Sequence, residues 1–302
     1  MLSLHTNSAA LSAQNSIGRT QSALSTSQTR LSTGFRVNSA MDDAAGLQIA
    51  TRLKAQTSGM AMAMRNTQNS ISMLQTAEGA FDEVTTMLTR MKDLATQAAD
   101  ASSTAKDQAA LQSEFDALGT ELNNVMKNTT FGGAKLLDGG TIATAMTFQI
   151  GASKSETMSM DLSTSMTTLT TTLGTVSGRY AAPTTATAGT EISDGSDGTA
   201  VGATNTAGQT AANNTIDTIS TAIDQVGAVR SSLGATANRL DHVYNNLSNI
   251  STNTKAATGR IMDTDFATES SNMTSAQMLL QAGTAMLKQS NSTSSLVMSL
   301  LQ

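Results

Sequence analysis

The sequence predicts a mainly α-helical protein in which long antiparallel helices form a coiled-coil-like bundle, with a small β-hairpin region and paired terminal helices. The first observation is that apolar residues recur every seven positions over long stretches of the 302 residues, which is the pattern of a coiled-coil seam. The second is that the chain contains one proline, Pro183, so that this helix breaker is missing from the long stretches before and after it.

The first predicted helix covers residues 1–33 and is weakly amphipathic, because the residues outside its repeat are mostly Ser, Thr, Gln and Asn. Its repeat is formed by Ala10, Ile17, Leu24 and Leu31. Gly34 follows directly, and glycine is the residue that most often ends a helix. After a short link that lacks the repeat, Asp42 and Asp43 offer an N-cap for the next helix.

Two longer helices are predicted to form the stable core, one over about residues 44–99 and one over 211–250. Their seam is formed by Leu74, Phe81, Leu88, Ile219, Val226, Leu233, Leu240 and Leu247. A third helix near residues 105–127 has apolar residues at alternating spacings of four and three. The polar stretch 251–259 is expected to interrupt the helical pattern before the last element.

A change of period between these helices predicts a β-hairpin near residues 143–162. Apolar and polar residues alternate there in two short runs, and a loop of Gly, Ser and Lys residues separates the runs. The apolar members are Met146, Phe148 and Ile150 in the first run, and Met158, Met160 and Leu162 in the second. Such alternation is typical of strands that bury one face.

Residues 163–210 consist mainly of Ser, Thr, Gly and Ala. A segment of this composition buries too little apolar surface to offset the entropy lost on ordering. We therefore expect it to be a surface excursion.

The last stretch, residues 262–302, carries a narrow apolar seam that matches the seam of the first helix. The seam of this pair is formed by Ile17, Leu24, Leu31, Met273, Leu280, Leu287, Val297 and Leu301. Matching seams favour pairing of the two terminal helices with each other. Because the seam is narrow, we expect the ends to fold only when neighbouring copies of the chain bury their remaining faces.

Composition excludes several classes of partner and site. A net charge of −5 and 3% aromatic residues argue against nucleic acid as a partner, and no apolar run is long enough for membrane insertion. The N-terminus lacks the pattern of a secretory signal, so that sequence rules alone indicate a cytosolic protein. The chain has no Cys, which excludes disulfides and thiolate sites. We expect no cofactor.

Candidate metal and catalytic residues are sparse. His5 and His242 lie far apart without metal-site spacing, and a packing or surface role is the simpler reading. The acidic residues Glu191, Asp194 and Asp197 resemble a calcium loop only loosely, and a turn is favoured. No catalytic constellation can be assembled, so we expect that the protein is not an enzyme.

Three stretches carry a resemblance to a known family. Residues 31–46 (LSTGFRVNSAMDDAAG) resemble the N-terminal signature of bacterial flagellin. Residues 130–139 (TFGGAKLLDG) look like the family's approach to its hairpin region, and residues 260–273 (RIMDTDFATESSNM) resemble its C-terminal signature. The resemblance is collinear and covers roughly residues 1–162 and 211–302, whereas the segment between them matches nothing.

The resemblance implies a subunit that is exported unfolded through the flagellar type III channel and polymerises head-to-tail into the filament used for swimming. This overrides the cytosolic indication. Implied partners are further copies of the chain, an export chaperone and the export apparatus, and the filament cap and hook-junction proteins. The implied segments are 1–42 and 257–302 for an inner-tube domain, 43–162 and 211–256 for a helical core domain, and 163–210 for a variable exposed segment. The hairpin residues Met146, Phe148, Ile150, Met158 and Met160 are then candidates for a curvature switch.

Arg90, Leu94 and Glu114 match positions through which related flagellins bind a Toll-like innate immune receptor. The simpler alternative is a solvated helix face with a peripheral core leucine. Two other functions stay open at this point: a hook–filament junction protein, which shares the terminal seams, and a secreted helical effector or adhesin. Growth of long filaments would distinguish the first reading from both.

Overall fold

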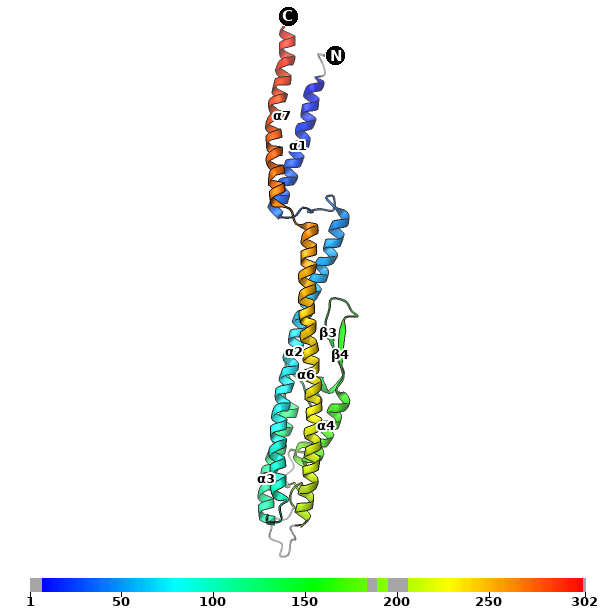
Figure 1. The fold of residues 1–302 in the computed structure, drawn as a ribbon, viewed down its shortest axis with the longest axis vertical. Helices are drawn as coiled ribbons and strands as arrows, with labels where there is room; N and C mark the ends of the chain where they lie inside the picture. The colour runs from blue at the N-terminus through cyan, green and yellow to red at the C-terminus, as the bar shows by residue number, and fades with distance from the viewer. Residues whose placement is uncertain (1–6, 184–188, 195–205, 301–302) are drawn as a thin grey trace. The chain divides into compact units, whose positions relative to one another are not determined.

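The computed structural model describes residues 7–183, 189–194 and 206–300, with side chains up to residue 293. The described elements are the helices α1 (Ser8–Thr33), α2 (Ala44–Ala98), α3 (Ala105–Asn128), α4 (Ser163–Val176), α5 (Gly178–Ala181), α6 (Thr206–Met262) and α7 (Phe266–Leu300), the 3-10 turn η1 (Thr141–Ala143), and the strands β1 (Thr130–Phe131), β2 (Ala134–Lys135), β3 (Met146–Gln149) and β4 (Thr157–Met160). Figure 1 shows the long helices and the hairpin of β3 and β4. The described strands form two small antiparallel pairs, β1 with β2 and β3 with β4. The predicted fold class is confirmed.

The chain forms two compact units. The first consists of Met1–Ser58 and Ile250–Gln302, and the second of Gly59–Asn249. Both boundaries fall inside helices, α2 and α6, whereas the sequence analysis placed them at residues 42 and 257. Each of these two helices therefore contributes residues to both units.

In the first unit, α1 and α7 run antiparallel, so that the start of α1 and the end of α7 lie at the same end of the pair (Figure 1). The side-chain oxygen of Asn7 caps α1 by accepting a hydrogen bond from the Ala10 amide at 3.1 Å. The helix ends at Gly34, whose φ of 76° is left-handed and therefore suits glycine. The predicted C-cap is confirmed.

The two links of the first unit are joined by backbone hydrogen bonds. Phe35 and Asp263 form an antiparallel bridge, the amide of Arg36 donates to the Met262 carbonyl at 2.6 Å, and the amide of Thr264 donates to the Gly34 carbonyl at 3.0 Å. Val37 follows Phe35 by two residues in the sequence and is buried, with 1% of its surface exposed. The end of α1 is thus fastened to the start of α7.

In the second unit, the predicted seam of α2 and α6 lies in the core. Leu74, Phe81, Leu88, Ile219, Val226, Leu233 and Leu240 are each at most 1% exposed. Leu247 lies apart from them, in a small cluster with Met60 and Ala63. Burial of such side chains is the main favourable contribution to folding of this unit.

The predicted hairpin is formed by β3 and β4. Met146 pairs with Met160 and Phe148 with Met158, and these four side chains are all buried. Ile150 is half-buried after the end of β3. The hairpin loop reaches α2, where a Cβ atom added to Gly59 would lie 2.7 Å from the Cβ of Ala152. Glycine is therefore required at this point of a long helix.

This contact gives a prediction for two glycines of α2. We expect Gly79→Ala to raise the free energy of unfolding by about 0.5–1 kcal/mol, because glycine is a poor helix former and nothing lies near an added Cβ atom. Gly59→Ala should lower it by about 1–3 kcal/mol instead, because the new methyl group would press on the Cβ atom of Ala152. Thermal unfolding of both variants, followed by circular dichroism, measures the difference. Equal effects of the two substitutions would contradict the close approach.

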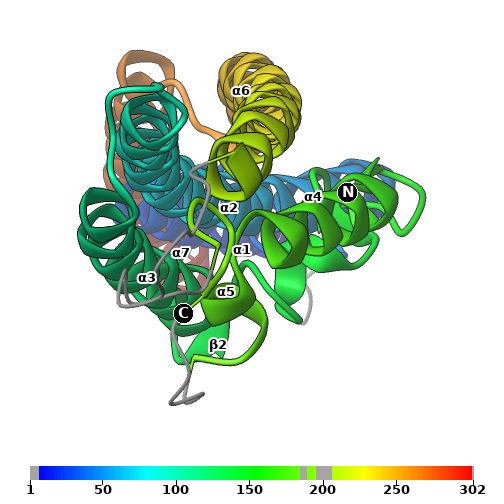
Figure 2. The same ribbon diagram turned by 90° about the horizontal axis from the view of Figure 1, so that it is seen from below.

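The expectation that residues 163–210 form a surface excursion is wrong for residues 163–183 and 189–193. Met166, Leu169, Leu173 and Val176 lie on one face of α4 and are at most 1% exposed. Tyr180 of α5 and Ile192 join the same core. Figure 2 shows α5 between α3 and α4, and α5 contacts both. The few apolar residues of this segment are spaced for a helix, which its average composition concealed.

The predicted interruption at residues 251–259 is also wrong, because α6 continues without a break to Met262. Ser251 is buried with 4% exposure, and the Thr258 hydroxyl donates to the Thr254 carbonyl one turn earlier at 2.9 Å. Hydroxyl side chains can bond in this way to their own helix. A polar stretch therefore does not by itself end a helix.

Candidate functional site

The predicted terminal seam lies between α1 and α7 of the same chain. Leu24 is buried, and Ile17, Leu31, Met273, Leu280 and Leu287 are half-buried. The side chain of Val297 and the whole of Leu301 lie outside the described residues. The two helices approach closely at Gly283, where an added Cβ atom would lie 2.9 Å from Cγ1 of Ile17. The seam is thus largely used within one chain.

Polar side chains are found inside this seam. The Ser27 hydroxyl donates a hydrogen bond to Oε1 of Glu269 at 2.6 Å, and the Arg30 guanidinium lies 3.7 Å from Oε2 of the same carboxylate. Ser27 and Glu269 are both buried, with 6% and 7% of their surface exposed. At the other end of the pair, the side-chain Nδ2 of Asn7 donates to the backbone carbonyl oxygen of Ser290 at 3.2 Å. We call Ser27, Arg30 and Glu269 the seam clasp.

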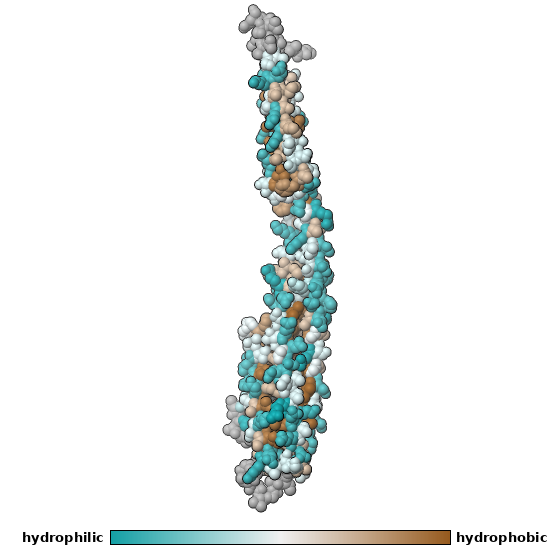
Figure 3. Space-filling view, turned by 60° about the vertical axis from the view of Figure 1, so that its left-hand side comes forward, coloured by the Kyte–Doolittle hydropathy of each residue, from teal (hydrophilic) through white to brown (hydrophobic). Residues whose placement is uncertain are grey.

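A second apolar feature of α7 is largely exposed. Leu279 and Met286 are 62% and 66% exposed, and because they lie seven residues apart they share one helix face. Gln281 and Lys288, also seven residues apart, mark a polar face of the same helix. Hydrophobic surface on the terminal helices is visible in Figure 3. We call Leu279 and Met286 the outer apolar row.

The first turn of α7 is stabilised by Asp265. Its carboxylate accepts hydrogen bonds from the Thr268 hydroxyl at 2.8 Å and from the Ala267 amide at 3.0 Å. These hydrogen bonds hold the pKa of Asp265 below its ordinary value, and the bond from the Thr268 hydroxyl has the largest effect. The predicted C-terminal signature thus contains the residue that begins the last helix.

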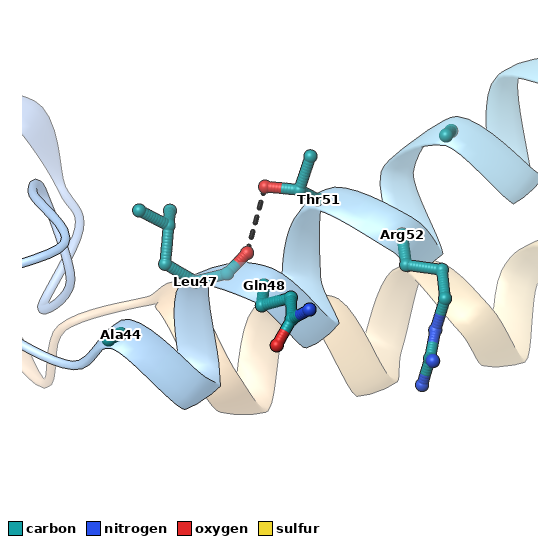
Figure 4. Close-up of a pocket in the computed structure, with 6 residues that line it drawn as sticks. Ala44, Leu47, Gln48, Thr51 and Arg52 are labelled. Atoms are coloured by element: carbon teal, nitrogen blue, oxygen red, sulfur yellow. Dashed lines mark hydrogen bonds between the residues drawn. The ribbon is translucent and has the colours of Figure 1, made fainter.

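Shallow hollows occur among the described residues of the first unit. One lies between α1 and α7 beside the seam clasp and includes Arg19, Asn272 and Leu279 in its lining. The other, shown in Figure 4, lies on the first turns of α2 and is lined by Ala44, Leu47, Gln48, Thr51, Arg52 and Ala55. In the figure the Thr51 hydroxyl bonds to the Leu47 carbonyl, and Arg52 points away from that pair. Among these described lining residues Arg52 alone is charged, so the second hollow offers no acid–base pair.

The three candidate receptor residues come from α2 and α3. Nε and Nη2 of Arg90 donate to Oε1 of Glu114, at 2.8 and 2.6 Å, and both side chains are about half exposed. Leu94 lies one turn beyond Arg90 and is only 2% exposed. A partner can therefore contact the Arg90–Glu114 pair directly, whereas the side chain of Leu94 is packed in the core beneath this part of the helix.

The remaining candidate residues do not converge. His242 is exposed on α6, and His5 and Asp197 lie outside the described residues. In residues 7–183, 189–194 and 206–300, no group of three His, Asp or Glu side chains is arranged to hold a metal ion. None of the described helices combines the length and hydropathy that crossing a membrane requires.

Sequence reasoning missed a polar network around Asp116 of α3. Nε and Nη2 of Arg179 both lie 3.1 Å from Oδ2 of Asp116, and the amide of Gly189 donates to the same oxygen at 3.0 Å. Gln112 donates to Asp116 at 2.8 Å and to Glu191 at 2.7 Å. These bonds fasten α5 and residues 189–192 to α3. The sequence offered one signal of this network, which is that Arg179 stands alone as a basic residue in a segment rich in Ser and Thr.

Tyr180 lies beside this network. Its hydroxyl is 3.5 Å from a carboxylate oxygen of Asp138. The pKa of Tyr180 is raised well above its ordinary value. Burial of the side chain has the largest effect, and the negative charge of Asp138 adds to it. The phenol is therefore neutral and serves packing.

Comparison with known proteins matches both halves of the helical framework. Residues 4–141 match the bacterial flagellin N-terminal helical region, and residues 216–301 match the bacterial flagellin C-terminal helical region. The chain is 35% identical to flagellin A of Vibrio anguillarum over an alignment that covers both chains in full. It is 38% identical to a flagellin of Halalkalibacterium halodurans, with 90% of each chain covered.

Among solved structures, a flagellar hook-associated protein of Vibrio parahaemolyticus aligns with a TM-score of 0.53 at 16% identity, and covers 74% of this chain and 100% of its own. That likeness concerns the fold alone. Bacillus cereus flagellin aligns with a TM-score of 0.44 at 25% identity, over 64% of this chain and 94% of its own. From the matched N- and C-terminal regions and the full-length relatives, it follows that the chain belongs to the bacterial flagellin family, whose members are the structural subunits of the extracellular flagellar filament.

Proposed function

We propose that the chain polymerises head-to-tail into the flagellar filament, and that the outer apolar row of α7 packs against neighbouring copies. The observation that supports this is the exposure of Leu279 and Met286 on a helix whose other apolar seam is already covered by α1. In a subunit that stayed alone, both side chains would remain in water. Exposed apolar surface is typical of sites that contact another protein surface. Contacts between different surfaces of successive copies build open helical polymers when the rotation from one copy to the next does not close a ring.

Export precedes assembly in this proposal. The subunit would pass the flagellar type III channel unfolded, held before export by a chaperone, and fold at the distal end of the filament under the cap. Hook-junction proteins would occupy the proximal end. The terminal pair supports this sequence of events, because its described part buries few side chains and leaves Leu279 and Met286 exposed.

The decisive experiment mixes purified monomer with sheared filament seeds and follows growth by electron microscopy. Long filaments are expected. A hook–filament junction protein would stop at short assemblies, and a secreted effector or adhesin would remain monomeric. The full-length relatives named as flagellins favour the first outcome.

We also propose that the hairpin β3–β4 influences filament curvature through its contact with α2. Phe148 and Met158 anchor the strands in the core, and the loop residue Ala152 touches α2 at Gly59. The variant Gly59→Ala should therefore change the supercoil of filaments as well as stability. Gly79→Ala is its matched control and should leave the supercoil unchanged.

A third proposal is recognition of the monomer by a Toll-like innate immune receptor through Arg90 and Glu114, with Leu94 beneath them. We expect Arg90→Ala to reduce signalling about tenfold or more in a reporter cell assay, because an exposed arginine is a frequent anchor of protein interfaces. Arg230→Ala removes a comparable arginine, paired with Asp82 on another face, and should leave signalling unchanged. Equal signalling by both variants would contradict the receptor proposal and favour a plain solvated helix face.

A further inference from the structure

The apolar contacts of the terminal seam distinguish one register of the helix pair from another chiefly at one point, the close approach of Ile17 to Gly283. On α1 the repeat is Ala10, Ile17, Leu24 and Leu31, and on α7 one seam position is filled by Ala276, Gly283 and Ser290. A slip of seven residues would exchange Ile17, Leu24 and Leu31 for one another with little change in size, but it would place Ala276 or Ser290 against Ile17, where an added Cβ atom is crowded. Heptad seams of this kind leave the register to be chosen by other contacts.

The seam clasp supplies a contact that only one register satisfies. Glu269 occupies the same heptad position as Ala276, and it is the charged member of that row. In the observed register its two oxygens meet the Ser27 hydroxyl and the Arg30 guanidinium. A slip by seven residues would bring Thr20 and Ala23, or Gly34 and Val37, to these places. In both cases Glu269 would lose its arginine.

We infer that the seam clasp of Ser27, Arg30 and Glu269 is the device that sets the register of α1 against α7. A buried carboxylate that loses its charged partner is strongly disfavoured, so each slipped register is penalised beyond the crowding of Ile17. The bonds of Asn7 to Ser290 favour the same register at the far end. Single buried polar groups are known to fix register in coiled coils, at a cost in stability.

The backbone bridge between Phe35 and Asp263 is a rival for this role, because it also fastens the two helices together. The two explanations differ in one respect. If the bridge sets the register, the clasp can be replaced by apolar side chains without consequence. If the clasp sets it, the same replacement keeps the helices paired but lets them slip.

The absence of cysteine from the sequence allows a clean test by disulfide formation. The pair Ile17→Cys with Gly283→Cys reports the observed register, because these positions are in contact. Ile17→Cys with Ala276→Cys, and Ile17→Cys with Ser290→Cys, report the two registers slipped by seven residues. All three pairs are introduced into the full chain, and oxidation is followed in the monomer and in seeded filaments.

With the clasp intact, we expect the product of the first pair alone. Glu269→Leu should raise the slipped products about tenfold or more, the change that loss of a hydrogen bond to a charged group produces. Glu269→Gln keeps an acceptor for Ser27 and nearly the same shape but loses the charge, so it should give a smaller rise. Gln281→Leu, on the polar face of the same helix, is the control and should give none.

Products of the observed register alone in both Glu269 variants would overturn the inference and assign the register to the bridge. Because Glu269→Gln is almost isosteric, this outcome can be recognised even if Glu269→Leu unfolds the pair. The inference does not rest on polymerisation. Slipped products in a monomer that never forms filaments would support the clasp while contradicting the proposed function.

Discussion

Replacing Met286 by lysine should abolish filament growth while leaving the monomer unchanged. Met286 is 66% exposed in the single chain, so a charged side chain there stays in water and costs less than about 0.5 kcal/mol of monomer stability. In a filament packed through the outer apolar row, the same ammonium group would be buried without a partner. That burial costs several kcal/mol at each contact, which corresponds to an increase of about a hundredfold or more in the critical concentration.

Leu279→Lys should have the same effect, because Leu279 lies one heptad earlier on the same face. The measurement is growth from sheared seeds, followed by electron microscopy and sedimentation. Far-ultraviolet circular dichroism of each monomer shows whether helix content is preserved.

A matched control is provided by the chain itself. Gln281 lies one heptad before the natural Lys288, so that Gln281→Lys places the same new charge on a face that already carries one. This variant should polymerise like the unmodified chain. If Met286→Lys and Gln281→Lys both grew normally, the outer apolar row would not be an assembly contact. If both failed, added charge on α7 in general, and not the row, would be responsible.

The sequence predicted the long helices and the hairpin well, because their signals are periodic and local. The sevenfold recurrence of Leu74, Phe81 and Leu88 shows which face of a helix is buried, and the alternation around Phe148 shows the same for a strand. Gly34 ended the first helix where expected, since its left-handed φ is a property of one residue. These features depend on few distant contacts.

The errors arose where tertiary contacts decide the outcome. α4 was missed because four apolar residues among many threonines are a weak signal, and their burial depends on the core beside them. The stretch after Ser251 was expected to break, yet its hydroxyl groups bond within α6 and the helix continues. Both cases show composition averaged over a segment giving the wrong answer, whereas the spacing of single residues would have given the right one.

Candidate residues were predictable in kind but not in environment. Sequence placed Arg90 and Leu94 one turn apart, but only the structure shows that Arg90 is ion-paired in solvent and that Leu94 is buried. The seam clasp and the Asp116 network were missed altogether. Each joins residues that are far apart in sequence, and a single buried carboxylate produces no periodic pattern in the sequence.

The Asp116 network gives the second large prediction, a selective loss of stability in Asp116→Ala. This variant should lower the free energy of unfolding of the second unit by about 3–5 kcal/mol, because Arg179 would be left buried without its counter-charge. The amide groups of Gln112 and Gly189 would also lose an acceptor. Denaturant unfolding monitored by circular dichroism measures the loss.

The pair of Arg230 and Asp82 is a close control, because its closest nitrogen–oxygen distance is the same 3.1 Å. It differs in exposure: the side chains of Asp82 and Arg230 are 69% and 31% exposed, against 10% and 16% for Asp116 and Arg179. Asp82→Ala should therefore cost only about 0–1 kcal/mol. Similar losses in the two variants would show that burial does not decide the worth of these pairs.

The predicted loss should be local before it is global, since Asp116 fastens α5 and the amide of Gly189 to α3. Brief trypsin treatment should cut Asp116→Ala after Arg179 well before it cuts the unmodified chain there, because the arginine leaves its buried site when its partner is removed. Adding Arg179→Met to Asp116→Ala should recover part of the lost stability, because no unpaired charge then remains in the core. A double variant as unstable as the single one would mean that the hydrogen bonds to Gln112 and Gly189, and not the arginine, account for the loss.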